Sequence, residues 1–134
     1  MLKRDSLTAQ MQQLSQVLAK VKRLIIEDKE NEALFVTEDL FEEYYKMSIH
    51  ELLESGDLEF SEKIKQLQAE EVNMLAYFID EYAGVQEEFP VQVILYKRYL
   101  LLIDILEQEY QFVSIDHMAR ASILNNAISR TNLD

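Results

Sequence analysis

Residue types suited to catalysis or metal binding are scarce in this chain. Its 134 residues include two His and no Cys, which excludes thiolate metal sites, iron–sulfur clusters, disulfides and a cysteine nucleophile. His50 and Glu54 are four residues apart, so one helix face could present both to a metal ion. A usable site needs at least one further ligand, and none occurs at a matching spacing. We therefore interpret His50 as a surface residue of a short helix.

The second histidine, His117, directly follows Asp116 in the predicted first turn of the last helix. Adjacent residues on a helix do not face each other, so the two cannot act as a catalytic dyad. An acidic residue in this position suits the positive end of the helix dipole. We predict no catalytic residue, no metal site and no cofactor, and we expect that the protein is not an enzyme.

Two charged residues interrupt the apolar pattern of predicted core helices. Glu71 falls in the middle of the apolar stripe of a helix over 61–83, and Arg98 in the middle of the stripe over 90–110. A buried charge is costly unless it is paired. If these helices are antiparallel, the two residues differ in height by about 7 Å, which a long Arg can span. We interpret them as a buried ion pair that fixes helix register. The alternative is a polar pocket that recognises a ligand.

Other side chains lie off the predicted core stripes and are candidates for contact with a partner. An exposed apolar pair beside Asp39 would form a small contact patch, and tyrosine rings are frequent interface anchors. A basic helix face is either solvated or docks to the acidic middle of another copy. The apolar pair is Phe35 and Val36, the tyrosines are Tyr77 and Tyr96, and the basic face contains Lys20 and Arg23.

Charge is distributed unevenly along the chain, whose formal net charge is −12. Residues 1–26 carry +4, residues 27–90 carry −15 and residues 91–134 carry −1. A polyanion is a poor ligand for nucleic acid and for anionic lipid headgroups. We expect no nucleic-acid or membrane partner. A basic protein, or contact between the basic head and the acidic middle of two copies, fits better.

Length and composition favour one all-helical domain over residues 1–134. Domains usually have about 100–200 residues. Two Gly and one Pro are too few for the left-handed turns of a multi-hairpin sheet or for a phosphate-binding loop. The most apolar run, 91–106, contains three charged residues and is too short to span a bilayer. No secretory signal opens the chain, so we expect a cytoplasmic location.

Apolar periodicity predicts five to six antiparallel helices that form helix pairs, the last helix being a C-terminal cap. Ser48 and Glu51 have the spacing of a capping box that opens a short helix, and Gly56 should end that helix. Gly84 is expected to be a left-handed cap. In the last helix, Leu124 and Ile128 are expected to touch something else, such as a second subunit. The predicted helices cover residues 6–27, 31–46, 48–53, 61–83, 90–110 and 114–129.

This layout resembles an uncharacterised bacterial family of short tetratricopeptide-like helical proteins, a domain of unknown function. The resemblance covers most of the chain and implies tetratricopeptide-like helix pairs with a role in partner binding. It implies no catalytic residue. The stretches that carry it are 1–5 with 12–14 and 17–19, 32–34 with 40–41 and 47–48, 52–53 with 56–58, and 112–114.

From these patterns we predict a non-enzymatic helical module for protein interaction or self-association. Its partner would be another protein or a second copy of the chain, as in a homodimer. The alternative is a helical bundle that binds a small molecule or a metal through a buried carboxylate.

Overall fold

The computed structural model describes residues 2–131, and within that range the chain is all α-helical, without strands. This confirms the predicted all-α class, although seven helices are present in the described range instead of five to six. They are α1 (Leu2–Ile26), α2 (Glu30–Glu43), α3 (Ile49–Glu54), α4 (Asp57–Ile64), α5 (Ala69–Gly84), α6 (Phe89–Tyr110) and α7 (Ile115–Thr131).

The additional helix arises because the helix predicted over 61–83 is two helices, α4 and α5. The chain turns after Ile64, where Leu67 N–H donates to the carbonyl of Ile64 at 2.9 Å. Gln68 is then extended and stands at the start of α5, and its N–H donates to Oε1 of Glu71 at 2.9 Å. A side-chain cap therefore starts α5 where the sequence has neither Gly nor Pro to mark a break.

Other helix ends follow the sequence signals more closely. The predicted capping box of α3 is present: Ser48 Oγ accepts from the N–H of Glu51 at 3.1 Å, and the Glu51 carboxylate accepts from the N–H of Ser48 at 3.3 Å. Pro90 lies in the first turn of α6, as predicted.

The two glycines match the predictions unequally: α3 ends at Glu54, just before Gly56, as predicted, whereas Gly84 is not a left-handed cap. Gly84 is the last residue of α5 and is not left-handed, and Gly56 precedes α4 with φ −67°. The left-handed positions of the described chain are instead Asp28, Lys46 and Gln111, with φ between 50° and 60°. Non-glycine residues therefore close the turns after α1, α2 and α6, at the modest cost of a left-handed backbone.

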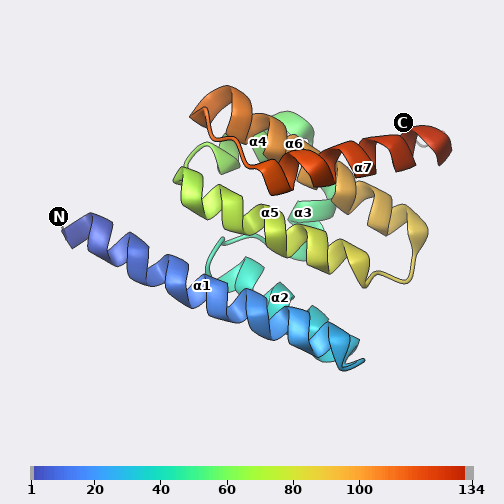
Figure 1. Ribbon diagram of the computed structural model, residues 1–134, viewed down its shortest axis with the longest axis horizontal. Helices are drawn as coiled ribbons and strands as arrows, with labels where there is room; N and C mark the ends of the chain where they lie inside the picture. The colour runs from blue at the N-terminus through green and yellow to red at the C-terminus, as the bar shows by residue number, and fades with distance from the viewer. Residues whose placement is uncertain (1, 132–134) are drawn as a thin grey trace.

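Figure 1 shows α5 in the middle of the molecule, with α1 along one edge and α7 along the opposite edge. Helix α5 lies against α6, and α1 and α2 lie against each other and against α5. Helix α6 also contacts α3, α4 and α7. None of the described helices is both long enough and apolar enough to cross a membrane.

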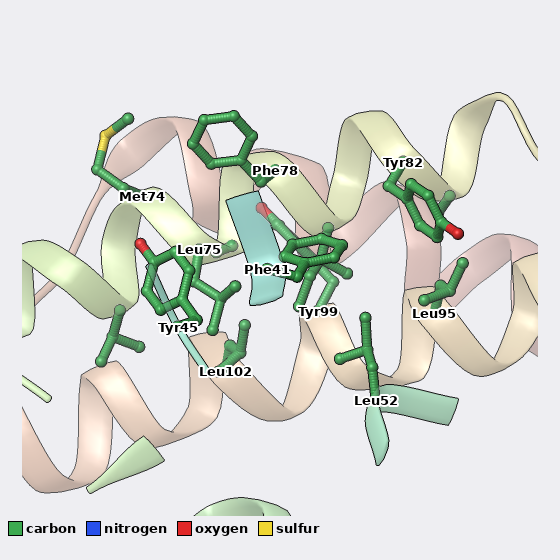
Figure 2. Packing of buried hydrophobic residues seen from close by; sticks show 14 of the residues in the cluster. Phe41, Tyr45, Leu52, Met74, Leu75, Phe78, Tyr82, Leu95, Tyr99 and Leu102 are labelled. Atoms are coloured by element: carbon green, nitrogen blue, oxygen red, sulfur yellow. The ribbon is translucent and has the colours of Figure 1, made fainter. Parts of the chain in front are cut away.

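The core is built around α5. Eight of its 16 residues are buried, against six of 22 in α6. Figure 2 shows Phe41 of α2, Leu75 of α5 and Tyr99 of α6 gathered between the helices. The rings of Phe41 and Tyr82 meet edge to face, with centroids 5.5 Å apart.

Candidate functional site

Glu71 lies in the first turn of α5, where both of its carboxylate oxygens have protein partners. Oε1 caps the helix at Gln68 N–H, and Oε2 accepts the hydroxyl of Tyr44 at 2.8 Å. The hydroxyl of Tyr45 donates to the backbone carbonyl of Glu71 at 2.7 Å. Burial, and secondarily the negative charge of Glu71, raises the pKa of Tyr44, which therefore remains a donor. Glu71 thus connects the C-terminal end of α2 to the start of α5.

Arg98 is buried on α6 and bonds to the short helices α3 and α4. Its guanidinium donates to the carbonyls of Leu52, at 2.9 Å, and of Ser55, and to Oδ1 of Asp57 at 3.0 Å. It also lies over the ring of Phe60, 4.8 Å from the centroid. These carbonyls come from the C-terminal end of α3, where no intrahelical donor remains for them.

The predicted ion pair between Glu71 and Arg98 is therefore wrong. Each side chain is bonded to a different helix end: Glu71 to the N-terminus of α5 and Arg98 to the C-terminus of α3. Because the helix is interrupted before α5, the N–H of Gln68 has no intrahelical partner and donates to Glu71. The short helices gave Arg98 carbonyls and a carboxylate that lie against α6.

We expect Glu71→Ala to lower the free energy of unfolding by about 1–2 kcal/mol, because a helix cap and the acceptor of Tyr44 are lost. Arg98→Ala should cost about 3–5 kcal/mol, since buried carbonyls lose their donor. Urea unfolding of both single variants and the double variant measures their coupling. The two costs should add to within about 0.5 kcal/mol, since the residues share no partner. A coupling above about 1 kcal/mol would restore the ion-pair hypothesis.

His117 is buried in the described structure, 2% exposed, between α5, α6 and α7. Its Nδ1 lies 2.7 Å from the hydroxyl of Tyr99, and its Nε2 lies 2.8 Å from Oδ1 of Asn73. The ring of Tyr77 packs on the imidazole, with centroids 4.3 Å apart. Burial lowers the pKa of His117 below its ordinary value of 6.5. A neutral imidazole fits this site, with Nδ1 accepting from Tyr99 and Nε2–H donating to Asn73.

Arg120 and Asp80 form a second polar link between α7 and α5. Nε and Nη2 of Arg120 donate to the two carboxylate oxygens at 2.9 and 3.0 Å, a bidentate arrangement. The guanidinium carbon lies 5.5 Å from the centroid of the Tyr96 ring. Beside this link is an open groove of about 370 Å³, lined by Ile25, Asp80, Glu81, Gly84, Val85, Tyr96 and Arg120. The polar inner side of α7 is thus attached to α5 at two points.

The outer side of α7 carries several large apolar side chains that are exposed. Ile115 is 84% exposed, Met118 55% and Ile123 59%, and Val113 in the preceding loop is 64% exposed. We call these four residues the α7 outer patch. The prediction that Leu124 contacts a second subunit is wrong, because Leu124 is buried in the core of its own chain. It lies on the helix side opposite to Ile115.

The remaining residues that the sequence offered for contact with a partner differ in their exposure. Phe35 is 72% exposed on α2, whereas Val36 packs partly against the core. Lys20 and Arg23 are exposed on α1. Tyr77 and Tyr96, proposed as partner anchors, are half-buried and pack against His117 and Arg120 of their own chain. Their position explains how α7 is held in place.

The histidine of α3 lies where the sequence places it. His50 is exposed, and its Nδ1 lies 2.8 Å from the carboxylate of Glu54. Among the described residues no group of three or more His, Asp or Glu side chains is arranged to hold a metal ion. Sequence reasoning missed the burial of His117. Its spacing of four and seven residues to Ala121 and Leu124 would have placed it on the inner side of α7.

Comparison with known proteins gave no match: no family model, no curated protein and no solved structure is similar to this chain.

The stability of the protein should fall as the pH drops below about 6.5, in part through His117. The unfolded chain binds a proton there more readily than the folded chain does, so acid favours unfolding. Thermal melts between pH 5 and 8 should show a weaker pH dependence for His117→Gln than for the parent chain. The control is His50→Gln, which removes an exposed histidine and leaves the buried site intact. An unchanged slope in His117→Gln would contradict a buried neutral imidazole.

Proposed function

We propose that this chain is a non-enzymatic helical protein-interaction or self-association module that acts in the cytoplasm. In this proposal tetratricopeptide-like, antiparallel helix pairs form the body and α7 forms the cap. The α7 outer patch carries the proposal. Contact with water is unfavourable for large apolar side chains that are exposed together on one helix. Covering them with another surface therefore lowers the free energy.

The attachment of α7 supports this role. Its inner side is fixed to α5 and α6 by the bidentate pair of Arg120 and Asp80, by His117 and by buried Leu124. Residues on a fixed helix lose less conformational entropy on binding than residues on a mobile loop. The α7 outer patch is therefore presented as a preformed surface.

The polar interior also favours a binding surface over a chemical site. Glu71 and Arg98, which the sequence offered as a pocket for a ligand, are occupied by groups of the protein itself. Among the described residues, no buried side-chain nitrogen or oxygen lacks a hydrogen-bond partner. A ligand pocket commonly presents a few convergent polar groups that are free to bind.

Affinity capture tests the proposal, with the tagged full chain as bait in an extract of the native cells and with untagged copies of the chain added. At least one protein, the chain itself included, should be retained by the parent and lost by the double variant Ile115→Lys, Met118→Lys. A binding loss of about tenfold or more is expected, since two charges would be buried in an apolar contact. Leu58→Lys, at a 74% exposed apolar residue of α4, is the matched control and should retain binding. Equal capture by the parent and the double variant would refute the proposal.

A further inference from the structure

The sizes of the side chains on the outer side of α7 suit packing against another helix. At 100° per residue, Ile115, Ala119, Ser122 and Asn126 lie along the middle of the outer side, and all four are exposed. Met118 and Ile123 flank them on either side. The small side chains of Ala119 and Ser122 let another helix axis come close there, and the larger apolar side chains can then pack beside it. The patch therefore fits a helix better than it fits an extended peptide.

Local charge on α7 permits a second copy of this chain on that surface. The body between residues 27 and 90 carries −15 and would repel its own copies, whereas a basic protein would be drawn there and not to α7. On α7 the charge of Arg120 is neutralised by Asp80. The remaining charges on the described helix are Asp116 in the first turn and Arg130 in the last turn, which cancel. The patch is thus a surface where two copies can meet with little local repulsion.

The charges of Asp116 and Arg130 also favour one orientation of two packed α7 helices. In an antiparallel pair centred on Ser122, Asp116 of one helix lies about 9 Å from the centre and Arg130 of the other about 12 Å from it, on the same side. The unlike charges then come within about 3 Å of each other along the helix axis, twice per dimer. The same centre places the two Ile123 side chains close together at the middle of the contact. A parallel pair would instead bring like charges together.

We propose that α7 packs in antiparallel fashion on α7 of a second copy, in a two-fold dimer centred near Ser122. This inference rests on the proposed interaction role of the α7 outer patch and names its partner. A contact between single helices is smaller than a standard stable interface, so the dimer is expected to be weak and concentration-dependent.

A single introduced cysteine tests the geometry, because the chain contains no Cys. In the Ser122→Cys variant the two sulfur atoms would lie near the two-fold axis, within the range of a disulfide. Mild oxidation should convert most of this variant to a covalent dimer. The control is Ser15→Cys, at an exposed serine of α1, which should remain monomeric under the same conditions. Equal cross-linking of both variants, or cross-linking of Ser15→Cys alone, would overturn the proposal.

Sedimentation equilibrium of the full chain up to about 1 mM tests the charge arrangement. Asp116→Arg and Arg130→Asp should each weaken the dimer about fivefold, and the double variant should recover the parental affinity because both pairs are inverted. Circular dichroism checks that each variant remains helical. A parent chain that is monomeric throughout would overturn the dimer. If the Ile115→Lys, Met118→Lys variant nevertheless lost another captured protein, the proposed function would stand with a different partner.

Discussion

Helix α5 contacts α1, α2, α6 and α7, so each polar group that is buried on its surface must find a partner inside the protein. Tyrosine hydroxyls provide many of these partners. Tyr82 of α5 donates to Glu38 of α2, Tyr45 donates to the carbonyl of Glu71, and Tyr99 of α6 meets His117 of α7. The bonds of Tyr82 and Tyr99 each join two different helices, and that of Tyr45 joins the segment after α2 to α5. The tyrosines thus supply apolar area and, through the hydroxyl, a fixed register between neighbours.

Apolar periodicity was sufficient to predict the helical class and most helix positions, since a stripe every 3.6 residues identifies a helix regardless of its neighbours. It failed at residues 65–68, where the stripe continues across a break. The break is marked by local hydrogen bonds, from Leu67 N–H to Ile64 and from Gln68 N–H to Glu71, which apolar periodicity cannot reveal. The same limit applies to Gly84, since left-handed turns here use Asp28, Lys46 and Gln111 instead.

The error over Glu71 and Arg98 has a general physical cause. The pair was predicted from the heights of Glu71 and Arg98 along two neighbouring helices. That comparison took account of only two of the seven helices in the described chain. Helix ends compete strongly for charged side chains, because each end leaves several backbone groups without partners. A chain with short helices such as α3 and α4 has many such ends. Arg98 therefore bonds to the carbonyls of α3, and Phe60 covers its guanidinium.

Helix α7 shows why folding and binding can use different sides of one element. Its inner side is fixed by Leu124 and by His117, which leaves the outer side with little part in the stability of the core. Ile123 and Met118 could then be polar without loss of packing inside the chain. Their apolar character is instead what a covering surface would require, since exposed apolar area contributes to association only when water is removed from it. The same argument does not extend to Phe35, which is a single exposed side chain without apolar neighbours of comparable exposure on α2.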